Sequence, residues 1–456
     1  MRASGRGWLA IVVAALAIVG ATAAEREGPK APPPAEPGTA VSSVWLCPHG
    51  GGPRWHGTIA IANPGDAPVE ARLRALGDGA SAAAGVVDVP AHGEVLRDVP
   101  ADARAASTAV EIFGGWAGVA WLVRAGGNES GLGAEPCTAD PGGSWSVVDA
   151  TTTRDATSYL IVMNPFAADA VIDVALFLPD KPPVRSAAWT DLPVRAGHSV
   201  ALNLRAALGK SIVGAQVTAT RGRVAVGSLV VGRHGGVRSV LAAPAAAPRW
   251  ILPVAGSPGG GEVSLLVPGD TGVRFSGTLL SDSPQQTAGN LTGVNQGGTS
   301  TVSAGVTTSG ASAVVLQVDA PGVVNAGFRA TGTGDDDQAA TGGTTTPASA
   351  WVVMPTAIGG SPKPSLVLVN DGEAVVTVTL RLLPEGGSEV GDEVTVAIPA
   401  HSATAAPKPF LTADPTAAVL ATGDGAFVAL GAGTSGPRGT GWYAMSLGVP
   451  LPTTGP

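Results

Sequence analysis

The sequence is poor in basic residues, in aromatic residues and in stretches free of glycine and proline. Its 27 Lys and Arg residues are scattered and are outnumbered by 35 Asp and Glu, which gives a net charge of −8. A nucleic-acid-binding protein requires a clustered basic face, so the sequence predicts no nucleic-acid partner. The 65 Gly and 38 Pro residues leave few runs of about fifteen residues in which a long helix could form.

Catalytic and cofactor motifs are also missing. The sequence contains no G-x-S-x-G nucleophile elbow and no complete P-loop. Cys47, His49 and His56 form one local cluster that could bind copper or zinc, but a disulfide at Cys47 would remove the thiolate. We therefore predict that the protein is not an enzyme and that it carries no metal and no cofactor.

The N-terminus has the features of an export signal. Arg2 and Arg6 precede an apolar stretch from Trp8 to Ala24, and Ala21-Thr22-Ala23 has the small-x-small pattern of a signal-peptidase site. The stretch is at the short limit for spanning a bilayer, so a cleaved signal peptide and an uncleaved signal-anchor both stay open. In either case we expect the rest of the chain to be extracytoplasmic, either secreted or anchored in the plasma membrane by this segment alone.

The two cysteines, Cys47 and Cys137, are expected to form a disulfide. An even number of cysteines in an oxidising compartment favours such a bond. It would close a loop of roughly 90 residues around the first part of the chain.

Four tryptophans introduce four similar segments at a nearly constant spacing. Trp45, Trp145, Trp250 and Trp351 are 100, 105 and 101 residues apart. Such spacing indicates a tandem repeat of one unit. Because one large ring fills space that a Val-rich core leaves open, we expect these tryptophans to be core residues.

Further landmarks recur inside each segment. A short apolar strand ends in a turn eighteen or nineteen residues after each tryptophan, where Asn or Asp can bond to nearby backbone groups and Pro fixes φ. These turns begin at Asn63-Pro64, Asn164-Pro165, Pro268-Gly269 and Asn370-Asp371. Later turns contain His92, His198 and His401, which we interpret as structural residues. Two strands around a Gly-containing turn then predict a β-hairpin.

These features amount to about seven short strands per segment. We predict an all-β protein of four tandem immunoglobulin-like β-sandwich modules, each with its own core, after an N-terminal signal or anchor helix. A radial propeller is the main alternative, but its blades usually take about 40–50 residues. The predicted parts are a signal peptide or signal-anchor at 1–24, a Pro-rich linker at 25–40, module 1 at 41–140, module 2 at 141–248, module 3 at 249–330, a flexible linker at 331–349 and module 4 at 350–452.

The repeats resemble an actinobacterial exported family of domains of unknown function. Repeats of that family run from a Trp through an L-x-N-P strand end and a V-P-A-x-S turn to a paired-strand segment. The resemblance covers about residues 44–450 and is clear in modules 1, 2 and 4, whereas module 3 lacks both the Asn and the Pro-Ala-His turn. It implies no established activity and no catalytic residues.

Three tryptophans outside the repeated position are candidates for ligand contact. Trp55, Trp116 and Trp189 lie in loop or hairpin-tip contexts. Exposed aromatic rings often stack on sugars or anchor protein partners. The alternative is partial burial against neighbouring loops.

The sequence favours a non-enzymatic envelope protein that acts as a spacer or interaction scaffold. One alternative is a carbohydrate-binding or adhesion protein that uses the loop aromatics of modules 1 and 2. Another is an accessory subunit of an envelope complex that handles glycans. The expected partners are therefore cell-wall glycan or envelope proteins.

Overall fold

The structure is a computed structural model. It describes residues 41–452 except 80, 180, 210–211, 234, 258–259, 269–271, 283–290, 296–297, 304–307, 332–336, 360, 388–392 and 436–442. The predicted signal segment at 1–24 and the Pro-rich linker at 25–40 lie outside the described residues. Residues 41–456 form one compact unit. Within its described part, no helix has the length and apolar character needed to span a membrane.

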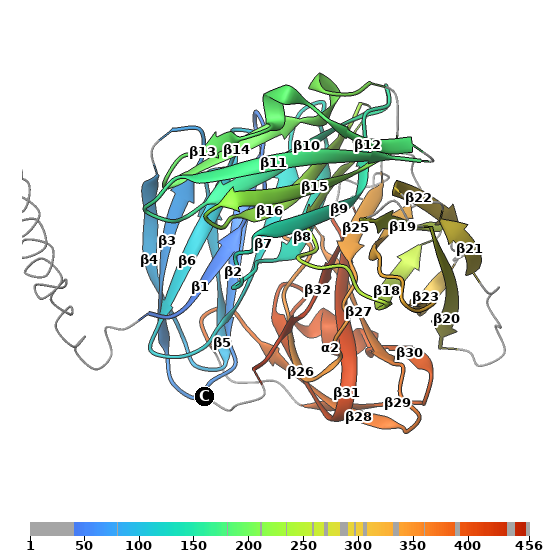
Figure 1. Cartoon of the computed structure of the whole chain (residues 1–456). Coiled ribbons are helices and arrows are strands. Elements are labelled where there is room, and N and C mark those ends of the chain that lie inside the picture. The colour runs from blue at the N-terminus through green and yellow to red at the C-terminus, as the bar shows by residue number, and fades with distance from the viewer. Residues whose placement is uncertain are drawn as a thin grey trace, which may run out of the picture. The chain divides into compact units, whose positions relative to one another are not determined.

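Segment 1 consists of two antiparallel sheets with the strand orders β1-β6-β3-β4 and β5-β2-β7-β8 (Figure 1). Side chains from both sheets contribute to one hydrophobic cluster. The strands are β1 (Val41–Cys47), β2 (His56–Asn63), β3 (Val69–Leu76), β4 (Ala82–Val89), β5 (Gly93–Val99), β6 (Ser107–Phe113), β7 (Gly118–Ala125) and β8 (Gly131–Pro136).

Segment 2 repeats this arrangement with the orders β9-β15-β11-β12 and β14-β10-β16-β17. Strand β13 pairs with β11 beside β12. The elements are β9 (Ser144–Thr151), β10 (Ala156–Asn164), β11 (Ala170–Leu178), β12 (Lys181–Arg185), η1 (Ala187–Trp189), β13 (Leu192–Val194), β14 (His198–Asn203), η2 (Leu204–Ala206), β15 (Ile212–Arg221), β16 (Ala225–Gly232) and β17 (Val237–Leu241).

Segment 3 has the orders β18-β23-β20-β21 and β22-β19-β24-β25. It keeps the pairing scheme although it lacks the Asn and the histidine-containing turn of the other segments. The strands are β18 (Arg249–Ser257), β19 (Gly261–Val267), β20 (Val273–Ser281), β21 (Leu291–Asn295), β22 (Gly298–Ser303), β23 (Thr308–Val318), β24 (Asn325–Thr331) and β25 (Gln338–Gly342).

Segment 4 follows the same scheme, but one long strand serves both sheets. Near its start β31 pairs with β26 and β28, and near its end it pairs with β27 and β32. The elements are β26 (Ala348–Val353), β27 (Lys363–Asn370), β28 (Val376–Leu383), β29 (Val394–Ile398), β30 (Ser402–Ala405), α2 (Lys408–Ala413), β31 (Ala418–Thr434), β32 (Tyr443–Leu447) and β33 (Val449–Pro450).

The all-β prediction is confirmed, because the described chain consists almost entirely of antiparallel strands. The strand orders differ from the division into A-B-E-D and C-F-G sheets of immunoglobulin constant domains, so the immunoglobulin-like detail stays unconfirmed. The sequence indicated about seven strands per segment, whereas segment 1 has one more, because β8 follows β7.

The hairpin prediction was wrong. Strands β6 and β7 flank a turn with positive φ at Gly114, but they belong to different sheets. Strand β6 pairs with β1 and β3, whereas β7 pairs with β2 and β8. The glycine therefore marks a crossover between sheets. A local pattern identifies the turn but does not decide which distant strand each arm pairs with.

The flexible linker predicted at 331–349 also requires correction. Residues Gln338–Gly342 form strand β25, which pairs with β24, and its Ala339, Ala340 and Thr341 are buried. Small and polar residues suggested a solvated segment. In the fold they form a short edge strand where neighbouring strands approach closely.

The four repeated tryptophans are core residues, as predicted. Their exposed fractions are 6% or less. In three segments the indole Nε1 donates to an equivalent backbone carbonyl at 2.8 Å, from Trp145 to Val224, from Trp250 to Val324 and from Trp351 to Phe427. Trp45 differs, since no described atom accepts from its Nε1, and its ring meets Trp116 edge to face.

Three buried asparagines join two turns in the same way. Asn164 accepts from the Phe166 N–H at 3.1 Å, as the turn chemistry predicted. Its Nδ2 also donates to the carbonyls of Ala168 and Val194, both at 2.9 Å. Asn63 and Asn370 make the equivalent bonds in segments 1 and 4. The second set of bonds ties the turn to a strand about thirty residues away.

Replacing Asn164 with alanine is expected to lower the free energy of unfolding by about 2 kcal/mol, because buried carbonyls lose their donor. Chemical denaturation of the variant measures this change. The exposed Thr190→Ala variant is the control and should change stability by less than about 0.5 kcal/mol. Equal effects in the two variants would refute a specific role for the asparagine.

The segments are joined by sheet-to-sheet contacts. We call the sheet with the first strand of a segment its first sheet and the other its second sheet. Leu46, in the first sheet of segment 1, belongs to the same hydrophobic cluster as Leu160, in the second sheet of segment 2. Ala175 and Phe177, in the first sheet of segment 2, contact Leu266 of segment 3. Each first sheet thus packs against the second sheet of the next segment.

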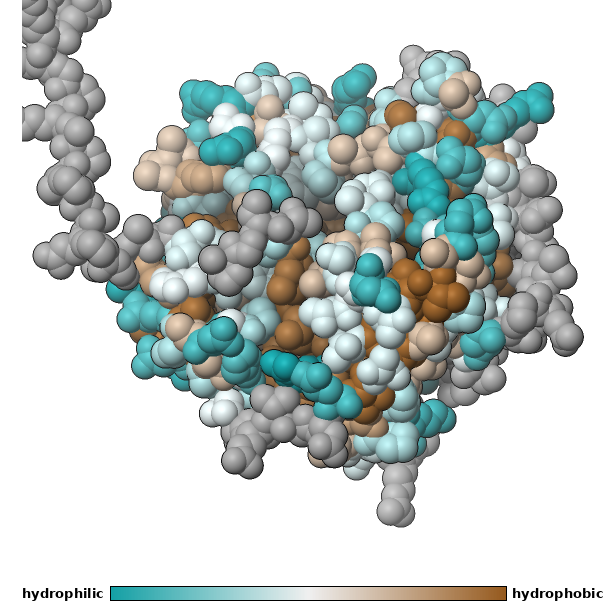
Figure 2. Space-filling model, turned by 90° about the horizontal axis from the view of Figure 1, so that it is seen from below, coloured by the Kyte–Doolittle hydropathy of each residue, from teal (hydrophilic) through white to brown (hydrophobic). Residues whose placement is uncertain are grey.

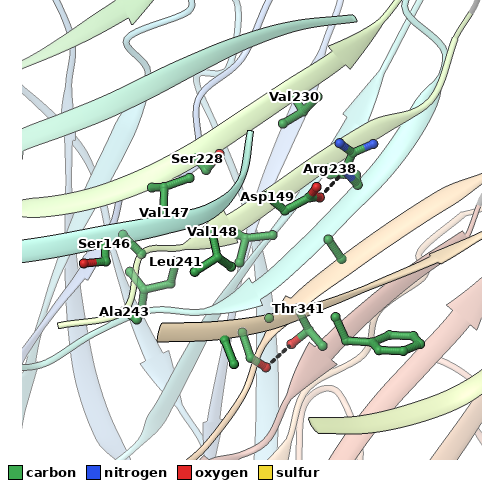
Figure 3. Close-up of a pocket in the computed structure, with 17 residues that line it drawn as sticks. Ser146, Val147, Val148, Asp149, Ser228, Val230, Arg238, Leu241, Ala243 and Thr341 are labelled. Carbon is green, nitrogen blue, oxygen red and sulfur yellow. Dashed lines mark hydrogen bonds and ion pairs between the residues drawn. The ribbon is translucent and has the colours of Figure 1, made fainter. Parts of the chain in front are cut away.

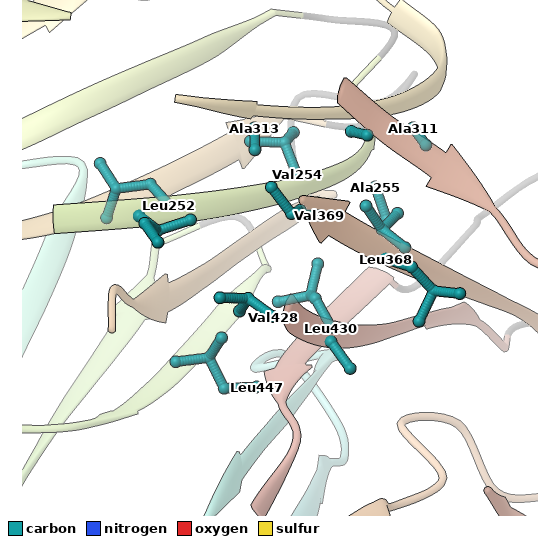
Figure 4. Close-up of a cluster of buried hydrophobic side chains, with 14 of the residues drawn as sticks. Leu252, Val254, Ala255, Ala311, Ala313, Leu368, Val369, Val428, Leu430 and Leu447 are labelled. Carbon is teal, nitrogen blue, oxygen red and sulfur yellow. The ribbon is translucent and has the colours of Figure 1, made fainter. Parts of the chain in front are cut away.

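Segments 3 and 4 share one hydrophobic cluster, so the expectation of a separate core in each module was wrong here. Val254 and Ala313 of segment 3 lie beside Leu368 and Val428 of segment 4 (Figure 4). Sheet faces that are apolar on both sides of a segment allow this continuity.

Segment 4 packs in turn against segment 1. Val352 of its first sheet and Met354, which follows β26, cluster with Ala60 and Ala120 of β2 and β7. The contacts between segments therefore close into a cycle within residues 41–456. Small alanine side chains let the two closing sheets approach each other.

One strand from each segment, namely β8, β17, β25 and β32, takes part in a common meeting point. Strand β8 contacts β17 and β32, and β25 contacts the same two strands; Figure 1 shows β8, β25 and β32 side by side. A Cβ at Gly133 of β8 would lie 2.9 Å from the Cβ of Ser239 in β17. Glycine at this position therefore permits the close approach of the two strands.

Candidate functional site

A narrow cavity between segments 2 and 3 is too small for a ligand. It has a volume of about 30 Å³ and is lined mainly by β9, β17, β24 and β25. In Figure 3 Asp149 and Arg238 form an ion pair across part of its wall. This space corresponds to about one water molecule, so the cavity is a packing seam.

Two larger hollows adjoin each other and form an arginine-lined groove. One has a volume of about 600 Å³ and the other about 430 Å³, and they share Ala156, Gly232 and Arg233. We define the arginine groove by its charged lining residues. These are Arg104, Glu129, Arg154, Asp155, Arg205, Arg233, Arg238 and Arg329.

Strand pairing in segment 2 brings three of these arginines to one end of its second sheet. Arg154 lies just before the start of β10, Arg205 just after the end of β14, and Arg233 just after the end of β16. Both β14 and β16 run antiparallel to β10, on its two sides. In antiparallel strands the end of one strand lies beside the start of the next. The three arginines therefore gather at the same end of the sheet.

Segment 1 supplies the opposite part of the groove through Arg104. Its guanidinium lies 5.3 Å from the ring centres of both Trp55 and Tyr159 and donates to the Gly51 carbonyl at 2.7 Å. It also forms an ion pair with Glu129, which accepts from the Trp55 Nε1 at 3.1 Å. These contacts fix Arg104 between segments 1 and 2.

A buried ion-pair network forms the inner end of the groove. Arg238 Nε lies 2.9 Å from Asp149 Oδ2, and Arg329 Nη1 lies 3.4 Å from Asp149 Oδ1. Arg329 also pairs with Glu262, and Arg238 donates to Gln338. Burial lowers the pKa of Arg238, although the neighbouring Asp149 opposes this shift. The network links segments 2 and 3 and neutralises its own charges.

Three other arginines of the groove lie outside this network. Arg205 donates to the backbone carbonyls of Thr153 and Ala156. Arg154 and Arg233 are exposed. Among the described residues none of the three forms an ion pair, and Asp155 is the acidic lining residue nearest to them in sequence. The groove is therefore locally positive in a chain with net negative charge.

None of the three candidate ligand-contact tryptophans has a fully exposed side chain. Trp55 and Trp189 are 5% and 8% exposed, which agrees with the alternative of burial against neighbouring loops rather than with exposed rings. Trp116 is half-buried and packs against Trp45, with a ring-centre distance of 6.1 Å. Trp55 contacts two lining residues of the groove, Glu129 and Arg104. Trp116 and Trp189 line neither of its hollows.

The cysteine and histidine cluster is dispersed by the fold. Cys47 forms a disulfide with Cys137, as predicted. His49 is fully buried, and its ring nitrogens contact the Gly50 carbonyl and the Thr108 hydroxyl at 2.7 and 3.1 Å. Burial lowers its pKa to about 4, so this imidazole is neutral. His56 lines a separate hollow.

The repeated histidines occupy equivalent turns. His92 and His401 have left-handed backbones with φ of 49° and 51°, while the neighbouring Gly197 takes this role in segment 2. His92 Nε2 lies 2.8 Å from Asp66, and His401 Nε2 lies 3.1 Å from Glu373. His198 contacts the Ala196 carbonyl at 2.8 Å. These local contacts agree with the structural role that the repeat predicted.

Two buried carboxyl groups lie between segments. Glu135 of β8 accepts from the Gly342 N–H at 3.2 Å and from the Thr341 hydroxyl at 3.4 Å. Glu94 of β5 lies where segment 1 meets segment 4, and its backbone N–H donates to the Pro384 carbonyl. Burial raises the pKa of each carboxyl group well above the ordinary value for glutamate, and the hydrogen bonds to each only partly oppose this rise.

The raised pKa of Glu135 predicts a pH-dependent stability. The folded state retains a proton that the unfolded chain releases, so stability is full below the unfolded pKa near 4.5 and falls as pH rises toward the folded value. Glu135→Gln should flatten this fall, because the amide cannot ionise. Denaturation midpoints measured from pH 4 to pH 9 test this.

The exposed Asp78→Asn variant is the control for Glu135→Gln. It should show the same pH dependence of stability as the unaltered protein. Glu94→Gln should also reduce the fall of stability with pH, independently of Glu135→Gln. An unchanged slope in Glu135→Gln would contradict a buried, protonated carboxyl at the meeting point of β8 and β25.

One surface of the molecule is mainly polar or intermediate in hydropathy. In Figure 2 hydrophobic residues show mostly in hollows between hydrophilic ones. A face of this kind suits contacts made by polar groups with water nearby.

The fold and the groove define an all-β protein of four repeated two-sheet segments with an arginine-lined surface groove. The chain belongs to DUF5719, a family of unknown function whose model matches residues 97–409. This range includes every charged lining residue of the groove. No curated protein matches the chain.

Proposed function

We propose that the protein is a non-enzymatic, extracytoplasmic envelope protein that acts as an interaction scaffold. The observation that carries this proposal is the arginine groove on a closed frame of sheets. Its charged lining consists of arginines with Glu129 and Asp155, and Glu129 is already engaged by Arg104 and Trp55. Guanidinium groups gathered in this way are suited to holding an anionic partner.

The extracytoplasmic location is supported by the disulfide and by the N-terminal sequence. The bond between Cys47 and Cys137 would persist in an oxidising compartment. The basic and then apolar start of the chain has the pattern of an export signal.

The cycle of contacts favours a compact scaffold over an extended spacer. A linear array of modules separates its ends in proportion to the number of modules. Here Val352 and Met354 of segment 4 pack on Ala60 and Ala120 of segment 1. The four segments therefore support one another and can hold in place the groove that segments 1, 2 and 3 line.

Localisation and partner capture test the proposal. The full chain, produced in the cells that encode it, is expected in the envelope or the medium and should crosslink reproducibly to an envelope component. Recovery in the cytoplasm would overturn the proposal. So would turnover of an envelope polymer by the purified chain that is lost when a single groove residue is substituted.

A further inference from the structure

We infer that the arginine groove binds an acidic glycan, a carbohydrate polymer that carries carboxylate or phosphate groups. This inference rests on the proposed function and names the class of its partner. It starts from Arg154, Arg205 and Arg233, whose charges have no acidic partner among the described residues. The planar guanidinium matches carboxylate and phosphate oxygens with two parallel hydrogen bonds.

The size of the groove points to a polymer. The two hollows have volumes of about 600 and 430 Å³ and adjoin at Gly232 and Arg233. A single phosphate or carboxylate would fill only a small part of either hollow. Arg154 and Arg205 line one hollow, and Arg233 lines both, so positive groups are distributed along the path. A ligand with several anionic groups in a row matches this distribution.

Neutral polar groups between the arginines suit sugar hydroxyls. Asn128 and Thr157 line one hollow, and Thr153 lines the other. Tyr159 is half-buried and adds a partly accessible ring beside them. Hydroxyl and amide side chains both donate and accept hydrogen bonds, which is the pairing that sugar hydroxyls require.

The aromatic groups of the groove argue against single-stranded nucleic acid. Such ligands need ring faces on which successive bases can stack. Trp55 is 5% exposed, and the guanidinium of Arg104 lies over the rings of both Trp55 and Tyr159. A sugar chain held by its charges and hydroxyls needs no open stacking faces.

Binding measurements on the purified full chain test the inference. The probes are polygalacturonate for carboxylates, poly(glycerol phosphate) for phosphates, neutral dextran, and an oligo-dT strand. Titrations at low and high salt should show that one or both acidic polymers bind, and that binding weakens with salt. Comparison of the two polymers identifies which acid the groove prefers.

A pair of arginine variants locates the site. Arg154→Ala with Arg233→Ala should weaken binding at least about tenfold, because two charge-assisted contacts are lost. Arg185→Ala with Arg195→Ala is the matched control, since both arginines are exposed on segment 2 outside the groove and the charge change is the same. It should bind like the unaltered chain, and both variants should keep the unaltered unfolding midpoint.

Four outcomes would overturn the inference. They are absence of binding to both acidic polymers, equal binding of neutral dextran, equal loss in the control variant, and tighter arginine-dependent binding of oligo-dT. None of them alters where the chain resides in the cell. An exported, envelope-associated chain that binds no acidic polymer would keep the proposed function and lose only this inference.

Discussion

Replacing Trp145 with alanine should lower the free energy of unfolding by about 4 kcal/mol, within the range for large buried aromatics. The ring is 1% exposed and lies in the core of segment 2. Its Nε1 also donates to the Val224 carbonyl at 2.8 Å, which would be left without this donor. Urea denaturation of the purified variant measures the loss.

Phenylalanine variants separate the two contributions. Trp145→Phe keeps most of the apolar surface and removes the hydrogen bond, so it should cost about 1–2 kcal/mol. Trp45→Phe should cost less, because no described group accepts from the Trp45 Nε1. If the two phenylalanine variants were equally destabilised, the repeated indole-to-carbonyl bond would not contribute to stability.

Removal of the disulfide is expected to have the next largest effect. Replacing Cys47 and Cys137 with alanine should lower the free energy of unfolding by about 2–4 kcal/mol, because the unfolded chain gains the freedom of a long loop. The bond joins residues 90 positions apart. Two backbone hydrogen bonds between Leu46 and Thr138 flank it at 2.8 and 3.0 Å and remain in the variant.

Chemical reduction provides the control for the disulfide prediction. The reduced, unaltered chain should unfold at the same denaturant concentration as the double alanine variant, and the oxidised chain at a higher one. A midpoint that does not respond to reduction or to substitution would contradict the prediction.

Local features of the fold were predictable from the sequence. The four repeated tryptophans were assigned to the core because large apolar rings at a fixed period have few other roles, and they are buried. The bonds from Asn164 to its own turn were predictable from turn chemistry. Its bond to Val194 was not, because nothing local specifies which distant turn lies beside it.

The pairing of strands and the groove were not predictable. Arg154, Arg205 and Arg233 are far apart in the sequence, so they were counted among scattered basic residues. They meet because β10 pairs with β14 on one side and with β16 on the other. Loop or hairpin-tip contexts made exposed rings one of two interpretations for Trp55 and Trp189, and tertiary packing buries both.

The cycle of sheet contacts has a consequence for how such a protein can change. An open array can gain or lose one unit, since each end needs only a cap. Here deletion of segment 3 would uncover the faces that Leu266 and Val254 now cover, and the remaining three units would have to meet at new angles. The copy number is thereby fixed, so new specificity can arise in loops such as those carrying Arg154 and Arg233 but not by duplication of a single unit.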